Sequence, residues 1–199
     1  LADFVIRCAV GYSENSLSKR FGRAMGNETG SIQQLIVVGM GKLGGRELNL
    51  SSDIDIMFIY DEPGTTQGGR SSTSSQEYFT RIAQLVIRLI DSVTGDGRIF
   101  RVDTRLRPFG DSGALVASYP SLEYYYDTIG RFWERYALLQ TRCSTGTTDR
   151  IKPFEELEEH FVYRRYTNFG VIEGLRSMKA LNDSERDKKG LVNDVKRDP

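Results

Sequence analysis

Residues 35–60 read LIVVGMGKLGGRELNLSSDIDIMFIY, and the fold expected for the whole chain is built around this stretch. The apolar, β-branched run at 35–38 predicts a buried strand, and a glycine-containing turn follows it directly. A second strand is expected at 53–60. There Asp53 and Asp55 alternate with isoleucine, so an extended backbone places both carboxylates on one face.

The turn and the second strand together have the chemistry of a phosphate site. Backbone N–H groups of a glycine turn can face a phosphate, and Lys42 follows Gly41 within that turn. Two carboxylates on one strand face repel each other unless a cation lies between them. Mg²⁺ accepts such oxygen ligands and shares them with substrate phosphates, so the pattern predicts phosphoryl or nucleotidyl transfer. The alternative for Asp53 and Asp55 is the solvated face of an edge strand.

A third strand, expected at 98–106, would add another carboxylate. Its alternation places Asp103 on one face with three arginines: Arg101, Arg105 and Arg107. Guanidinium groups suit bidentate phosphate binding, and three carboxylates can hold two metal ions. The alternative for these arginines is structural salt bridging, for example to Glu47 or Asp61.

The glycine run at 39–44 also matches the dinucleotide-binding pattern G-x-G-x-x-G, with Asp61 near the position of a ribose-binding acid. We disfavour this interpretation. Residues 42–52 are too few, and too interrupted by glycine, for the crossover helix of a βαβ unit. It would also leave Asp53 and Asp55 without a role.

Patterns elsewhere complete the expected fold, an α/β (α+β) core with a small mixed sheet, followed by a helical extension. The domain organisation expected is the end of a preceding helical segment and a connection at 1–30, the catalytic core at 31–118 and the extension at 119–199. Helices are expected as a tail over the first dozen residues, as a turn at 46–48, from a cap at Ser74 or Ser75 to near residue 91, and after residue 119, with an amphipathic stretch at 171–181. A short strand is expected at 114–117. Polar connections are expected up to residue 31 and as a loop at 61–73.

Composition narrows the classes of function. Lys+Arg and Asp+Glu are both 27, giving a formal net charge of +0, which argues against a general nucleic-acid binder. No apolar run approaches the ~20 residues of a membrane helix. Cys8 and Cys143 belong to no metal-binding motif and are expected to be free thiols in a reducing cytoplasm. Because the chain begins at Leu1 and stops abruptly, we expect a fragment of a longer protein.

The run GMGKLGGRELNLSSDID at 39–55 resembles the nucleotidyltransferase motif of the DNA polymerase β superfamily, in which a Gly-Ser or similar pair precedes Asp-x-Asp by about ten residues. Lys42 departs from the Gly or Ser that is usual there. In detail the sequence is similar to the bifunctional glutamine synthetase adenylyltransferase/adenylyl-removing family. Further stretches that carry this resemblance are RVDTRLRPFGDSG at 101–113, WERY at 133–136, VYRRY at 162–166 and LRSMK at 175–179.

The resemblance implies a polymerase β-type nucleotidyltransferase fold and a set of roles. Three carboxylates would be catalytic and would hold Mg²⁺, as two ions: Asp53, Asp55 and Asp103. Residues of the turn and the following segment would contact phosphate: Gly41, Lys42 and Ser52. Two arginines would hold the incoming phosphate or the AMP phosphoryl group: Arg105 and Arg107.

Members of the family carry two such domains. The C-terminal one transfers AMP from ATP to a tyrosine of glutamine synthetase, and the N-terminal one removes it by phosphorolysis, releasing ADP. The SSDID and RLRPFG runs look more like the adenylyl-removing domain. The implied partners are glutamine synthetase, the PII signalling protein, nucleotide and phosphate, in the cytoplasm and without nucleic acid or membrane. The alternatives are the adenylylating half, a related uridylyltransferase and a non-catalytic docking module.

Overall fold

The computed structural model describes residues 1–49, 52–95 and 97–163. It confirms the strands expected near 35–38 and at 53–60 as β2 and β3, and the helix expected to end near residue 91 as α3. In chain order the elements are α1 (Ala2–Phe21), β1 (Gly22–Gly26), β2 (Ile36–Met40), α2 (Gly41–Gly44), β3 (Ile54–Tyr60), β4 (Gly64–Gly68), α3 (Ser75–Asp91), β5 (Val102–Asp103), the short 3₁₀ helix η1 (Gly110–Ser112), β6 (Val116–Ser118), α4 (Tyr119–Thr128), α5 (Phe132–Leu138), β7 (Thr141–Cys143) and α6 (Thr148–Val162).

The main sheet is mixed and has β3 and β2 at its centre. These two strands are antiparallel, and β7 pairs antiparallel with the other edge of β2. Both β5 and β6 pair parallel with β3 on its remaining edge: β5 beside Ile54 and Asp55, and β6 beside residues 58–60. The expected mixed α/β fold with helices towards the end is therefore confirmed.

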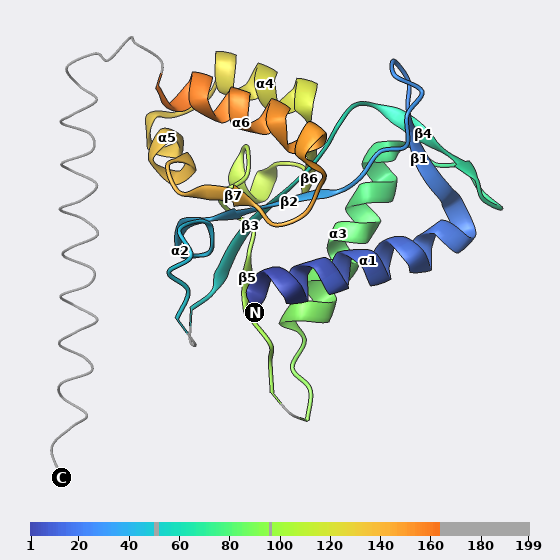
Figure 1. Ribbon diagram of the computed structural model, residues 1–199, viewed down its shortest axis with the longest axis horizontal. Coiled ribbons are helices and arrows are strands. Elements are labelled where there is room, and N and C mark those ends of the chain that lie inside the picture. The colour runs from blue at the N-terminus through green and yellow to red at the C-terminus, as the bar shows by residue number, and fades with distance from the viewer. Residues whose placement is uncertain (50–51, 96, 164–199) are drawn as a thin grey trace, which may run out of the picture.

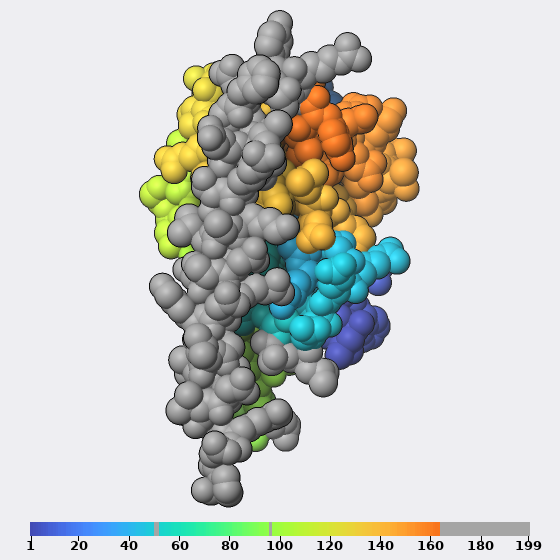
Figure 2. Space-filling model, turned by 90° about the vertical axis from the view of Figure 1, so that its left-hand side faces the viewer, coloured from blue at the N-terminus to red at the C-terminus, as the bar shows by residue number. Residues whose placement is uncertain are grey.

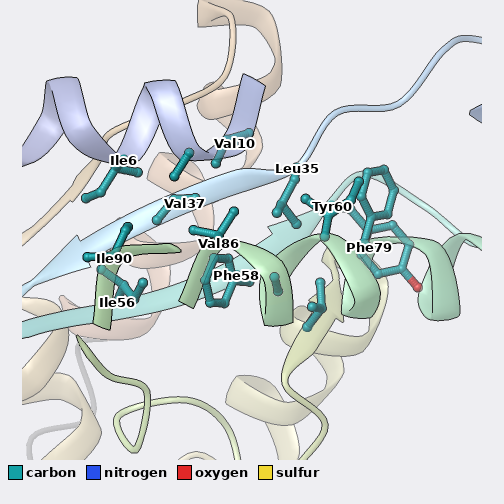
Figure 3. Close-up of a cluster of buried hydrophobic side chains, with 14 of the residues drawn as sticks. Ile6, Val10, Leu35, Val37, Ile56, Phe58, Tyr60, Phe79, Val86 and Ile90 are labelled. Carbon is teal, nitrogen blue, oxygen red and sulfur yellow. The ribbon is translucent and has the colours of Figure 1, made fainter. Parts of the chain in front are cut away.

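Helices cover both faces of this sheet. Helices α1 and α3 lie on one side, and α4, α5 and α6 lie on the other (Figure 1). Along β3, Ile56 and Phe58 face the first layer, where they join a cluster with side chains of α1 and α3 (Figure 3). Met57 and Ile59 face the second layer. Because both faces are buried, β3 is apolar without interruption after Asp55.

The start of α3 follows the expected chemistry. Ser74 occupies the N-cap position, and its hydroxyl accepts a hydrogen bond from the backbone N–H of Glu77 at 3.2 Å. The apolar residues of α3 then repeat at helical spacing and enter the core: Tyr78, Phe79, Ile82, Val86 and Ile90.

Two expected connections were wrong, because they contain strands. Helix α1 continues to Phe21, and β1 follows it at once. The polar loop expected at 61–73 contains β4, which pairs antiparallel with β1 in a separate two-stranded sheet. Both strands begin and end with glycine, and the only side chains that they bury are those of Ala24 in β1 and Thr66 in β4. With one buried side chain each, these strands show no apolar alternation that the sequence could reveal.

The third strand is also much shorter than expected. Only Val102–Asp103 pair with β3, and the chain leaves the sheet after Asp103. The carboxylate Oδ1 of Asp103 accepts the backbone N–H of Arg105 at 2.8 Å, which turns the backbone away from an extended course. The expected alternation therefore fails beyond Asp103. The strand expected at 114–117 is shifted to β6. The helical turn expected at 46–48 does not form, and the expected glycine turn contains the short helix α2.

Strand β7 was not expected, since the sequence after 119 indicated helices alone. It returns the chain to the sheet beside β2, so a boundary at residue 119 would divide this sheet. The division into 31–118 and 119–199 stays a prediction, and the amphipathic stretch at 171–181 lies outside the described residues. Cys8 and Cys143 are free thiols, as expected. Within the described part of the chain, no helix combines the length and the apolar character that crossing a membrane requires.

Candidate active site

Two carboxylates meet where β3 and β5 run side by side. Asp55 and Asp103 are register partners in the parallel β3–β5 pair. Neighbouring strands lie about 4.8 Å apart, so their side chains start from adjacent positions. On its other side Asp55 is paired with Met40, the last residue of β2, and the glycine turn begins immediately afterwards. Asp53 lies one residue before β3 and completes the acidic group.

The carboxylate of Asp55 is half-buried and surrounded by like charge. Burial raises the pKa of Asp55 above its ordinary value, and the negative charges of Asp103 and Asp53 raise it further. The positive charges of Arg105 and Lys42 offset part of this shift. The ionised form of Asp55 therefore destabilises the folded protein, and a cation bound among the three carboxylates would offset this effect.

Arginines pair with the other two carboxylates. Arg101 Nε lies 3.5 Å from Asp53 Oδ1. Arg105 clasps Asp103, with Nε 2.9 Å and Nη2 2.5 Å from Oδ2, and these hydrogen bonds lower the pKa of Asp103. Salt bridging was the alternative role for these arginines, and both form ion pairs. The expected partner Asp61 is bound instead by Arg150.

The glycine turn faces this acidic group. Gly41 has φ 53°, in the left-handed region, and a Cβ there would lie 3.3 Å from Asp55 Oδ2. Lys42 Nζ donates to Ser52 Oγ at 3.4 Å, which links the turn to the segment just before Asp53. The structure thus places Gly41 beside Asp55 and Lys42 beside Ser52, and their contact with phosphate stays a prediction.

Arg107 is placed differently from its expected position. Its guanidinium is largely buried, and Nη1 donates to the carbonyl oxygen of Thr104 at 2.7 Å and to the Thr104 hydroxyl at 2.9 Å. Nε donates to the carbonyl oxygen of Gly113 at 3.5 Å. These bonds hold the loop after β5 closed. Contact between Arg107 and a phosphate stays a prediction.

Comparison with known proteins identifies the group to which this arrangement belongs. The family model described as Glutamate-ammonia ligase adenylyltransferase matches residues 1–157, which include every expected site residue. The chain belongs to this family.

Individual relatives in the glutamate-ammonia ligase adenylyltransferase family are similar along nearly the whole chain. A protein of Pseudomonas putida is 46% identical over 196 residues, or 98% of this chain, and one of Nitrosococcus oceani is 44% identical over 199 residues, or 100%. Both are named bifunctional glutamine synthetase adenylyltransferase/adenylyl-removing enzyme. The match covers only 20% of either relative, so this chain spans about a fifth of their length.

Nucleotidyltransferases such as this family typically use Mg²⁺, and the donor chemistry here fits that ion. The three carboxylates offer only oxygen ligands, as Mg²⁺ prefers. Among the described residues, however, no three acidic, histidine or cysteine side chains converge as a ready metal-binding group. Arg101 and Arg105 engage Asp53 and Asp103, and both side chains are mostly exposed, at 66% and 71%. They can therefore swing into solvent when a cation takes their place.

Sequence reasoning missed the network that supports the loop after Asp103. Glu134 is buried and accepts hydrogen bonds from the Tyr125 hydroxyl at 2.7 Å and from the Arg131 backbone N–H at 2.6 Å. The Tyr125 oxygen in turn accepts from the backbone N–H of Phe109 at 3.5 Å. Phe109 has φ 61°, a conformation that is unfavourable for a bulky residue. A glutamate inside the aromatic WERY run was the available signal.

Proposed function

We propose that this chain carries the site that removes AMP from an adenylylated tyrosine of glutamine synthetase, with inorganic phosphate as acceptor. The observation that supports it is the pairing of Asp55 with Asp103 opposite the Gly41–Lys42 turn, in a chain of this family. The SSDID and RLRPFG runs favour the adenylyl-removing activity over AMP transfer from ATP. Regulation by the PII protein and a cytoplasmic location are proposed on the family resemblance.

In the proposed reaction, an oxygen of inorganic phosphate attacks the phosphorus of tyrosyl-AMP, and the bond from phosphorus to the tyrosine oxygen breaks. The proton of the attacking phosphate passes to the departing phenolate, which yields ADP and tyrosine. Lys42 and the backbone of the glycine turn would hold the incoming phosphate. Arg105, once released from Asp103, would pair with the negative charge of that phosphate. Two Mg²⁺ ions bound to Asp53, Asp55 and Asp103 would supply the positive charge that neutralises the reacting phosphoryl group.

Activity distinguishes this proposal from its rivals. The protein that contains this chain is incubated with adenylylated glutamine synthetase, and phosphate-dependent release of ADP is measured. Incorporation of AMP from ATP would identify the adenylylating half, and UTP-dependent transfer would identify a uridylyltransferase. If phosphate and nucleotide do not bind at all in the presence of Mg²⁺, the fold serves as a docking module.

A matched pair of variants locates the activity in this site. Asp103→Asn should reduce ADP release by at least about 100-fold, because one of the three carboxylates proposed to hold Mg²⁺ is lost. Asp149→Asn removes an exposed carboxylate at the start of α6 and should leave the rate unchanged. Full activity in Asp103→Asn would contradict the assignment of the carboxylates.

A further inference from the structure

An apolar pocket of about 520 Å³ opens beside the acidic group. Gly41 forms part of its wall and also lies against Asp55, so the pocket and the carboxylates are separated by one residue without a side chain. The remaining wall comes from α5, the segment that leads to β7 and the loop after β5: Leu106, Trp133, Tyr136, Ala137, Leu139 and Gln140. In Figure 2 the cyan segment that follows α2 lies directly below the gold segment of α5.

The pocket differs in charge from the neighbouring site. None of its lining residues carries a charge, whereas Asp55, on the other side of Gly41, is influenced by the charges of Asp53, Asp103, Arg105 and Lys42. Its volume falls within the roughly 300–1,000 Å³ of small-molecule sites, which are mostly apolar with a few polar groups. A ligand that spans both regions needs a charged end and a flat, uncharged end.

We propose that this pocket binds the adenine base and ribose of the nucleotide whose phosphates lie at the carboxylates. The inference rests on the proposed function and extends it to the part of the substrate that distinguishes a nucleotide from phosphate alone. Trp133 and Tyr136 lie three residues apart on α5 and so project from one helix face, and both line the pocket. Their rings supply flat surfaces on which a base can stack.

Gln140 supplies the polar group that a base edge requires. Its side chain is exposed, and its amide lies against the glycine turn, with Cδ 3.5 Å from the position of a Cβ on Gly45. A carboxamide both donates and accepts, as the edge of adenine does. Tyr136 is 53% exposed, so its ring is available to a ligand. The alternative occupant is the phenol ring of the substrate tyrosine. That ring is smaller than adenine and has one polar atom.

The chain contains its own reporter for this pocket, because Trp133 is its single tryptophan. AMP, ADP, ribose 5-phosphate and inorganic phosphate are each titrated with MgCl₂ while Trp133 fluorescence is recorded, and calorimetry measures binding in parallel. AMP should change the fluorescence to saturation and bind about tenfold more tightly than ribose 5-phosphate, from which it differs only by the base. Ribose 5-phosphate and phosphate should bind without a comparable change in fluorescence.

Variants test the stacking surface. Tyr136→Ala should weaken ADP binding about tenfold and leave phosphate binding unchanged. Tyr124→Ala is the matched control, since Tyr124 is a 66% exposed tyrosine on α4 that does not line the pocket. It should bind both ligands like the unmodified chain.

The outcomes separate this inference from the proposed function. Asp55-dependent binding of phosphate, with AMP no tighter than ribose 5-phosphate, would overturn the pocket inference and leave the proposed function standing. Saturable quenching by N-acetyltyrosinamide but not by ADP would assign the pocket to the phenol ring and also overturn it. If no ligand binds through Asp55, both fail together.

Discussion

Among the individual residues, Asp55 and Asp103 are neighbours with opposite electrostatic settings. Burial and adjacent carboxylates raise the pKa of Asp55, whereas hydrogen bonds from Arg105 lower that of Asp103. A raised carboxylate pKa means that the ionised group costs stability in the folded state, and a lowered one means that it contributes stability. Removing the negative charge should therefore stabilise the folded protein at Asp55 but not at Asp103.

Asp55→Asn should make the metal-free protein more stable at neutral pH, although it should abolish the phosphate-dependent release of ADP. The advantage should shrink as the pH falls towards the ordinary aspartate pKa of 3.8, where the original carboxylate becomes neutral in both folded and unfolded states. The free energy of unfolding is measured in urea over a series of pH values, without Mg²⁺ and with it. Saturating Mg²⁺ should reverse the order, because only the original side chain gains from the ion.

Asp103→Asn is the natural contrast for this measurement. It removes a carboxylate whose ionised form is favoured, so this variant should be less stable than the unmodified protein at neutral pH. That deficit should vanish as the pH falls below 3.8 and through the lower folded pKa. Equal behaviour of the two variants would show that Arg105 does not neutralise Asp103 in solution.

The site residues also show what sequence alone could place. The Asp-x-Asp spacing and the glycine turn are local, so their relation follows from strand geometry. The positions of Arg105 and Arg107 could not be derived, because they depend on a turn that Asp103 makes with its own downstream backbone. Alternation predicted that Arg107 shares a strand face with Asp103, and its guanidinium instead donates to carbonyl oxygens of its own loop.

At the level of elements, α2 and the segment before β7 pack without room for a side chain. A Cβ on Gly44 would lie 2.1 Å from the carbonyl oxygen of Gln140 and 2.9 Å from that of Gly39. A Cβ on Gly45 would approach nothing closer than 3.5 Å, and its backbone is right-handed helical. The close approach joins the glycine turn to the strand that returns after α5.

Gly44→Ala should therefore destabilise the protein by about 1–3 kcal/mol, because backbone atoms must move apart. It should also lower activity, since the turn carries Gly41 and Lys42. Gly45→Ala is the matched control and should change the free energy of unfolding by no more than about 0.5 kcal/mol. Urea denaturation of both variants measures the difference. Equal stabilities would mean that Gly44 does not lie against the Gln140 backbone in solution.

Which elements could be predicted depends on how they gain their stability. Strands β2 and β3 and helix α3 bury continuous or periodic apolar faces, and Ser74 marks the helix start, so sequence patterns identified them. Strands β1, β4 and β7 are short and join partners far along the chain. Their apolar content is too small to produce a pattern, and only tertiary pairing defines them.

For the molecule as a whole, one sheet forms the centre of two helical layers. Residues of β2 and β3 alternate between the two cores, so each layer depends on the same strands. Trp133 lies in α5 in one layer, and Phe79 is fully buried in α3 in the other. We therefore expect these layers to unfold together.

Phe79→Ala should lower the free energy of unfolding by about 3–5 kcal/mol, and the loss should appear fully in the fluorescence of Trp133. The midpoint of a urea transition followed by that fluorescence makes the comparison. Val93→Ala changes a 69% exposed side chain and should shift the midpoint little. A Trp133 transition unmoved by Phe79→Ala would indicate independent units and would support a boundary near residue 119.

The two-residue length of β5 has a consequence for control of the enzyme. Only two residues of β5 pair with β3, whereas β2 pairs with residues 55–59 along the opposite edge of that strand. Brief detachment of β5 costs far less than global unfolding, so one acid can withdraw while the rest of the centre stays intact. We therefore expect a partner that draws residues 98–101 away from β3 to lower the enzymatic activity, and one that holds them against β3 to raise it.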